Sequence, residues 1–112
     1  MDSENQLDAA FAALAHPARR AILARLARGA ATVNTLAEPL DMSLPAVSKH
    51  IRVLENAGLI TRGREAQFRP CTLNIDPLRA VVDWTDQYRH IWDARFDVMD
   101  NILKTMKEPK DE

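Results

Sequence analysis

Apolar residues recur at steps of three and four along most of this chain, the spacing that places them on one face of an α-helix. The first such stretch follows a capping-box pattern at Ser3 and Gln6, so a first helix is predicted to begin at Ser3. Pro17 suits the first turn of a second helix, which should run to about Ala27. The apolar stripe of the first helix consists of Leu7, Ala10, Phe11 and Leu14.

Two more helices follow, joined by a short turn. Thr32 can cap a third helix over residues 33–38, because Pro39 lacks the amide hydrogen that would continue it. Ser43 is a favourable N-cap for a fourth helix, and Gly58 suits the left-handed conformation that ends one. The predicted buried stripe of this fourth helix is Leu44, Val47, Ile51 and Leu54.

The pattern then changes to two short strands, predicted over residues 59–64 and 68–73, with residues 65–67 at the tip between them. Asp76 and Pro77 open a last helix that should extend to about Met106, roughly 45 Å at 1.5 Å per residue. Its apolar positions recur at steps of three and four up to its end. The set is Leu78, Val81, Val82, Tyr88, Trp92, Phe96, Met99, Ile102, Leu103 and Met106.

This order of elements predicts a mainly α fold with one small β-hairpin, in a single domain over residues 1–112. About five helices and a two-stranded wing make it a winged helix-turn-helix, which places one helix in the DNA major groove. The helix-turn-helix covers about residues 33–57, the wing about 59–73 and the last helix about 77–106. No repeat or linker divides the chain.

The charge distribution agrees with a nucleic-acid partner, although the formal net charge of the whole chain is only −1. Residues 16–70 hold nine basic and four acidic side chains, a net charge of +5, whereas residues 1–15 and 71–112 each carry −3. For a polyanionic partner the local field matters more than the total. Double-stranded DNA is therefore the expected partner of the central segment.

The face of the fourth helix opposite its apolar stripe holds the candidate reading side chains. Arginine and lysine there can neutralise phosphates, and arginine can also form two hydrogen bonds to guanine. His50 lies between the two faces, so it fits either a DNA contact or a packing role. On the wing, arginines can reach phosphates or a minor groove. The predicted DNA-binding set is Ser43, Pro45, Ser48, Lys49, His50, Arg52, Arg62, Arg64, Gln67 and Arg69.

The amino-acid sequence of this segment also resembles that of the ArsR/SmtB family of bacterial transcriptional repressors. The likeness spans roughly residues 7–92 and is carried by AEPLDMSLPAVSKHIRVLENAGLI, then RGREAQ and RPC. It implies a sequence-specific, cytoplasmic DNA-binding regulator that represses transcription from a palindromic operator, its own operon among the candidates. It also implies a homodimer built on the first and last helices. The predicted interface set is Leu7, Phe11, Leu14, Tyr88, Trp92, Phe96, Met99 and Leu103.

The metal sites of that family are not matched here, so no metal and no cofactor is predicted. Residues 33–40 hold no Cys, His or Asp, although one type of site needs clustered thiolates there. On the last helix His90 and Asp93 lack upstream partners, because Arg79 and Pro77 stand at those positions. A metal- or thiol-responsive repressor, the latter through Cys71, stays an alternative, as does a winged-helix protein-interaction module.

The sequence argues against two further classes of protein. No nucleophile elbow, P-loop, HExxH or dinucleotide fingerprint occurs, so we do not expect an enzyme. The N-terminus is acidic, and the longest apolar run, residues 9–15, is far shorter than the ~20 residues of a membrane span. We therefore expect no membrane partner.

Overall fold

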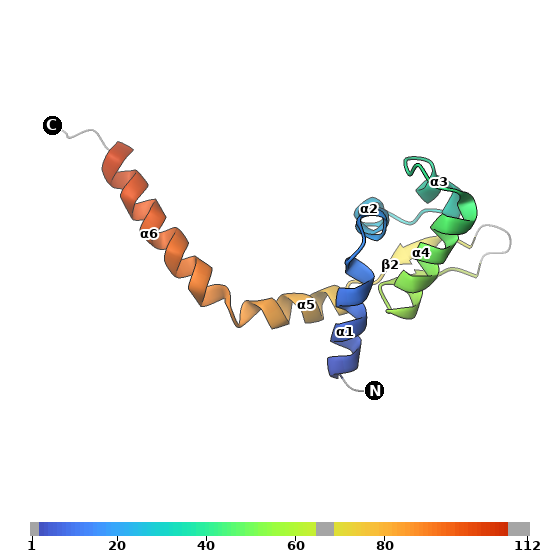
Figure 1. Ribbon diagram of the computed structural model, residues 1–112, viewed down its shortest axis with the longest axis horizontal. Helices are drawn as coiled ribbons and strands as arrows, with labels where there is room; N and C mark the ends of the chain where they lie inside the picture. Colours follow the sequence, from blue (N-terminus) through green and yellow to red (C-terminus); the bar gives the residue numbers. More distant parts are fainter. Residues whose placement is uncertain (1–2, 65–68, 108–112) are drawn as a thin grey trace. The chain divides into compact units, whose positions relative to one another are not determined.

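A computed structural model describes residues 3–64 and 69–107, apart from the side chains at positions 3, 94, 96, 97 and 107. The chain forms two compact units, Met1–Val81 and Val82–Glu112. Within the described residues there are six helices and a two-stranded antiparallel sheet (Figure 1). Their bounds are α1 Ser3–Leu14, α2 Pro17–Leu26, α3 Val33–Ala37, α4 Leu44–Asn56, β1 Ile60–Arg62, β2 Cys71–Leu73, α5 Asp76–Asp86 and α6 Arg89–Lys107.

Side chains cap the starts of α2 and α3, and of these two caps the sequence predicted the one at Thr32. His16 precedes α2, and its Nδ1 accepts the amide hydrogen of Ala18 at 3.1 Å. Thr32 caps α3 through its hydroxyl, which accepts from the Thr35 amide at 3.3 Å. Such caps satisfy amide groups that have no partner within their own helix.

The core of the first unit lies where α1, α2, α3 and α4 meet the base of the hairpin. Cys71 of β2 pairs with Arg62 of β1 and, on its other side, exchanges two backbone hydrogen bonds with Ala31. The hairpin is thereby held against the segment that leads into α3. The buried residues of this core are Ala13, Ile22, Leu23, Leu26, Ala31, Leu36, Val47, Ile51, Leu54, Leu59, Ile60 and Cys71.

The end of α4 is joined directly to the start of the hairpin. Gly58 has a φ of +78°, a conformation that glycine adopts at little cost. This turn lets the amide of Leu59 donate to the Leu54 carbonyl at 2.9 Å. Asn74, just after β2, donates its backbone amide to Leu59 at 2.9 Å and its side-chain amide to Gly58 at 2.8 Å. Helix α4 and the base of the wing are therefore one connected piece.

The predicted single last helix is wrong in one respect, because the chain breaks it into α5 and α6. The amide of Tyr88 bonds to the carbonyl of Thr85 at 2.9 Å, a tighter step than in an α-helix. The side-chain amide of Gln87 donates a hydrogen bond to the carbonyl of Trp84 at 2.9 Å. In an uninterrupted α-helix that carbonyl would accept from the amide of Tyr88. A side chain thus replaces a backbone donor, and the helix restarts at Arg89.

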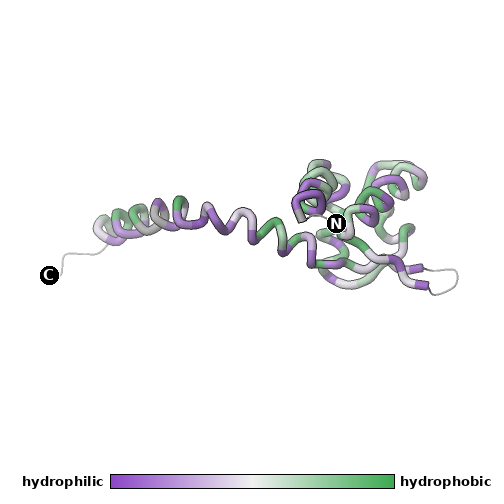
Figure 2. Tube along the Cα trace, turned by 90° about the horizontal axis from the view of Figure 1, so that it is seen from below, coloured by the Kyte–Doolittle hydropathy of each residue, from purple (hydrophilic) through white to green (hydrophobic). Residues whose placement is uncertain are grey.

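In the second unit, α6 carries apolar residues among hydrophilic ones along its length (Figure 2). Several of these apolar side chains are exposed in the single chain, including Trp92 at 43% and Met106 at 74%. Across the described residues we find no helix with the length and apolar character required to span a bilayer.

Candidate nucleic-acid interface

Helix α4 has a buried face and an exposed face, as the sequence predicted. Val47, Ile51 and Leu54 are completely buried. Lys49 and Arg52 are exposed, as is Pro45 in the first turn, and Ser48 is half-buried. The same helix contacts α1, α2, α3 and β1. The body of the domain therefore holds one side of α4 and leaves a basic side free.

The first turn of α4 departs from the prediction. Leu44 fits the three- and four-residue spacing, yet it is 47% exposed, so its assignment to the buried stripe is wrong. The turn lies beyond the packed part of the core, and Leu44 lines a surface pocket instead. Ser43 is the N-cap, and its hydroxyl accepts the Ala46 amide at 3.3 Å. This predicted DNA-contact residue therefore has a structural bond of its own.

His50 is held by Arg19, a residue to which the sequence had assigned no role. An Nη of Arg19 lies 3.1 Å from Nδ1 of His50. Because a guanidinium can only donate, Nδ1 must be the acceptor, and the ring hydrogen resides on Nε2. Arg19 also donates through Nε to the Ala13 carbonyl at 2.6 Å and through its other Nη to the Ala12 carbonyl at 3.2 Å. One side chain thus closes the end of α1 and fixes the orientation of His50.

The surroundings of His50 favour its neutral form. Its ring lies 4.3 Å from that of His16, centroid to centroid. Burial, followed by the charges of His16, Arg19 and Lys49, lowers the pKa of His50 below the ordinary value of 6.5. A protonated ring would also lose the acceptor that Arg19 uses. His50 therefore offers one N–H donor, on Nε2.

The wing carries three described arginines, and their surroundings differ. Arg64 and Arg69 are exposed, whereas Arg62 is half-buried and its Nε has neither solvent contact nor a hydrogen-bond partner. The predicted wing residue Gln67 lies outside the described residues. The base of the wing is closed by the Gly63 amide, which donates to the Pro70 carbonyl at 2.8 Å.

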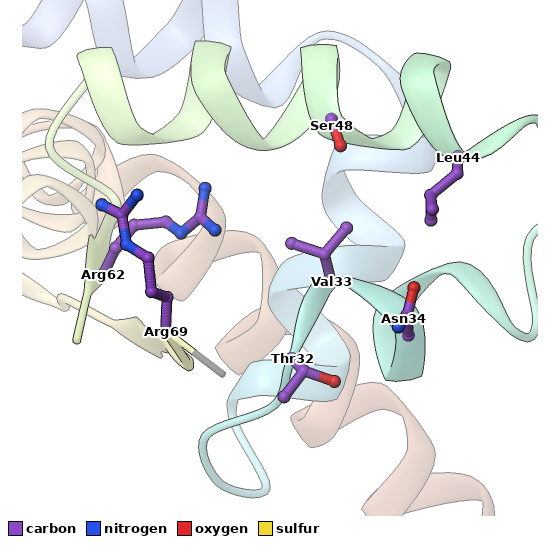
Figure 3. A pocket seen from close by; sticks show the side chains of 7 residues that line it. All are labelled: Thr32, Val33, Asn34, Leu44, Ser48, Arg62 and Arg69. Atoms are coloured by element: carbon purple, nitrogen blue, oxygen red, sulfur yellow. The ribbon is translucent and has the colours of Figure 1, made fainter. Parts of the chain in front are cut away.

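A surface pocket of about 380 Å³ lies between α3, α4 and the wing (Figure 3). The predicted residues Ser48, Arg62 and Arg69 meet there, and the side chains of both arginines extend toward α4. The start of α3 contributes residues that sequence reasoning missed, because no local pattern distinguishes them. The lining is completed by Thr32, Val33, Asn34 and Leu44.

The residues predicted for a dimer interface fall into two groups. Leu14 packs against the core of its own chain, and Leu7 is half-buried. Phe11 and four residues of the C-terminal segment are exposed. The side chain of Phe96 lies outside the described part of the chain. The four exposed residues are Tyr88, Trp92, Met99 and Leu103.

The candidate sensor groups are placed as follows. Cys71 is completely buried in β2, and burial raises the pKa of its thiol, so little reactive thiolate forms. In the part of the chain that the structure describes, no three His, Cys, Asp or Glu side chains gather closely enough to hold a metal ion.

Helix α3, the turn, α4 and the hairpin together define the class of winged helix-turn-helix proteins, which bind DNA. Residues 14–63 match a family model described as a helix-turn-helix domain. The transcriptional repressor SdpR of Bacillus subtilis is 35% identical over 74 residues, which cover 66% of this chain and 82% of SdpR.

Two solved structures narrow the class to a family. The crystal structure of an ArsR family transcriptional regulator matches with a TM-score of 0.72 and 44% identity, covering 79% of this chain and 97% of that one. The solution structure of a homodimeric winged helix-turn-helix DNA-binding domain from Mycobacterium bovis, a possible ArsR-family regulator, matches with a TM-score of 0.62 and 25% identity, covering 78% and 82%.

This chain belongs to the ArsR family of winged helix-turn-helix transcriptional regulators. The family membership confirms the resemblance noted in the sequence and the predicted fold class. It also confirms the prediction of a DNA-binding regulator in place of an enzyme, because the family consists of DNA-binding regulators.

Proposed function

We propose that this chain is a homodimeric repressor that binds a palindromic operator, with α4 of each protomer in the major groove. The observation that carries the proposal is that α4 is buried on one face and exposed on the other. Val47, Ile51 and Leu54 are completely buried, while Lys49 and Arg52 are exposed on the same helix. A helix enters a groove only when the protein holds one side and the other is free for DNA.

The proposed contacts divide by chemistry. Arg52 can form two hydrogen bonds to one guanine, and Ser48 can donate to or accept from a base edge. His50 donates from Nε2, because Arg19 occupies Nδ1. The remaining proposed contacts position the protein through phosphates or a minor groove. They are made by Ser43, Lys49, Arg62, Arg64, Gln67 and Arg69, while Pro45 has no hydrogen-bond donor and can make only an apolar contact.

The homodimer is proposed from the exposed apolar side chains of the C-terminal segment. Tyr88, Trp92, Met99 and Leu103 are 41–58% exposed, which is unusual for large apolar side chains unless a partner covers them. The relative from Mycobacterium bovis is described as homodimeric. Two-fold symmetry would supply two copies of α4 for half-sites about 34 Å apart.

Fluorescence anisotropy with duplexes from the region upstream of the chain's own gene tests the proposal. Affinity should fall steeply with salt, by roughly 0.9 log unit per decade of salt for each phosphate neutralised. Arg52→Ala should weaken binding, whereas Arg79→Ala, which removes an exposed arginine of α5, should not. A DNA affinity that changes neither with salt nor with Arg52→Ala would refute the proposal.

Three alternatives are less well supported. A thiol-responsive repressor needs a reactive thiolate, and burial of Cys71 opposes its formation. A metal-responsive repressor needs clustered ligands, which are not found among the described residues. A protein-interaction module would not need the basic face of α4. The proposed repressor acts in the cytoplasm, and its own operon is the first candidate target.

A further inference from the structure

Arg19, in the first turn of α2, joins the end of one helix to the middle of another. Its Nε and one Nη donate to the carbonyls of Ala13 and Ala12, at 2.6 and 3.2 Å, in the last turn of α1. Its other Nη lies 3.1 Å from Nδ1 of His50, the central residue of the 13-residue helix α4. Because the donors of a guanidinium lie in one plane, these three bonds fix the direction from the end of α1 to the His50 ring.

The apolar contacts of α4 do not fix this direction by themselves. Val47, Ile51 and Leu54 hold the helix in the core, but the burial of apolar surface has no preferred angle. A hydrogen bond, in contrast, weakens steeply when its donor and acceptor are out of line. The bond from Arg19 to His50 therefore adds a directional contact between α4 and the corner where α1 meets α2.

Arg20, the next residue, gives a comparison within the same chain. Its Nη1 donates to the Leu14 carbonyl at 2.8 Å, so it also closes the end of α1. Its side chain is exposed, and in the described structure only Arg19 of the two also bonds to α4. The two arginines thus share the bonding to α1 and differ in the contact with His50.

His50 can keep its bond to Arg19 only while the imidazole ring is neutral. A protonated ring carries a hydrogen on Nδ1, and a guanidinium has no acceptor to offer it. The ring of His16, 4.3 Å away between centroids, also uses Nδ1 as an acceptor, for the Ala18 amide at 3.1 Å. A proton added to His50 therefore removes the acceptor that links α4 to Arg19.

The groups around His50 make this bond sensitive to acid. The charged or titratable groups that act on His50 are His16 and Arg19 at the start of α2 and Lys49 on α4, and all three are basic. The last turn of α1 and helix α3 have no titratable side chain. Arg62 of β1 lines the pocket on the side of Ser48 and is not among the groups that act on His50.

We propose that Arg19 is a positioning residue, which sets the orientation of α4 against α1 through its bond to His50, and that acid releases this joint. The consequence for DNA rests on the function proposed above, in which α1 belongs to the dimer and α4 is the reading helix. In a two-fold dimer the orientation of α4 within each protomer sets the distance between the two reading helices. Arg19 thereby governs which spacing between half-sites is accepted.

The joint is tested first on the full chain without DNA. Residual dipolar couplings of the backbone amides, measured by NMR, give the orientation of α4 relative to α1. Arg19→Gln should change this orientation, whereas Arg20→Gln, the matched control, should not. As the pH falls through the lowered pKa of His50, the unaltered chain should reach the same changed orientation. His50→Asn should show no such change with pH, because Oδ1 of asparagine can accept from Arg19 and does not titrate.

Several results would overturn the proposal. One is an orientation that is the same in Arg19→Gln as in the control, and another is an equal response to pH in His50→Asn. His16→Asn keeps an acceptor for the Ala18 amide, so a loss of the pH response in this variant would assign the response to His16 and refute the acid release. If Arg19→Gln does not fold, His50→Leu breaks the joint and leaves the bonds from Arg19 to α1. An unchanged orientation in His50→Leu then contradicts the proposal.

The second test uses operator duplexes with one base pair inserted or removed between the half-sites, which changes their separation by about 3.4 Å. The unaltered chain and Arg20→Gln should lose affinity on the altered duplexes. In Arg19→Gln the ratio of affinities for natural and altered spacing should shrink about tenfold, the size expected for the loss of one charge-assisted hydrogen bond. An equal loss on every spacing would make Arg19 a direct DNA contact, so the joint fails and the repressor proposal stands. If no duplex binds at all, the repressor proposal fails, and the dipolar couplings still decide the joint.

Discussion

Two neighbouring residues of α4 should respond in opposite ways to the same substitution. Ile51 is completely buried in the core of the first unit, whereas Arg52 is exposed. Changing isoleucine to alanine removes three carbon groups, at about 0.8 kcal/mol each, so ~2.4 kcal/mol of transfer free energy is lost. The cavity left behind brings the expected loss for Ile51→Ala to about 2–5 kcal/mol.

The expected loss is large enough for a thermal melt. A small domain loses roughly 4–8 °C in melting temperature per kcal/mol, so Ile51→Ala should melt about 8 °C lower or more. Arg52→Ala removes an exposed side chain and should stay within about 0.5 kcal/mol of the unaltered stability. Its DNA affinity should fall about tenfold or more, because a bidentate arginine–guanine contact is worth about 1–3 kcal/mol.

The assay pairs circular dichroism melts with DNA titrations by fluorescence anisotropy. All melts use one protomer concentration, since dimerisation makes the melting temperature depend on concentration. Ile51→Ala should bind DNA normally at temperatures where it is folded. The face assignment of α4 would be refuted if Arg52→Ala lowered the melting temperature as much as Ile51→Ala.

Four further results are expected. Because the pKa of His50 is lowered in the folded chain, the unfolded chain binds more protons below pH 6.5. The contribution of neutral His50 to the free energy of unfolding is therefore complete above pH 6.5 and is lost as pH falls through the lowered pKa. The free energy of unfolding, measured with urea, should therefore fall less steeply with decreasing pH in His50→Asn than in the unaltered chain. Trp92→Glu should give monomers in sedimentation velocity, because a dimer would bury an unpaired charge; a normal dimer would remove Trp92 from the interface. Gly63→Ala would place a Cβ 3.1 Å from Pro70 Cδ, so the wing should shift and DNA affinity fall, with little change in urea stability. Cys71 should react with an alkylating reagent far more slowly in the folded chain than in denaturant, and equal rates would contradict its burial.

The parts of the fold that depend on local periodicity were predictable from the sequence. Val47, Ile51 and Leu54 define one side of a helix by spacing alone, and Thr32 and Ser43 are N-caps because of their side-chain oxygens. These features need only residues a few positions apart. For that reason the helix-turn-helix and the exposed basic face of α4 could be identified before the structure was known.

Other features depend on how deep the core reaches and on distant contacts. Spacing gives the direction of Leu44 around α4, but not that the first turn extends past the core. The bond between Arg19 and His50 joins residues 31 positions apart, so no local pattern contains it. The break between α5 and α6 contains no glycine or proline, and the side chain of Gln87 donates there to the Trp84 carbonyl. The lining of the pocket between α3, α4 and the wing by residues of α3 is likewise a matter of tertiary packing.

The hydrogen bonds that join the end of α4 to the hairpin have a consequence for how operators are distinguished. Hydrogen bonds among Leu54, Gly58, Leu59 and Asn74 join α4 to the hairpin, the two elements that we propose face DNA, so the two should move together. The separation between helix and wing is then set by the protein, and the duplex must conform to it. Groove width and stiffness vary with base sequence. Base pairs that neither element contacts should therefore alter the affinity, because their sequence changes the free energy needed to deform the duplex. The protein should thus recognise the shape of its operator as well as its base sequence.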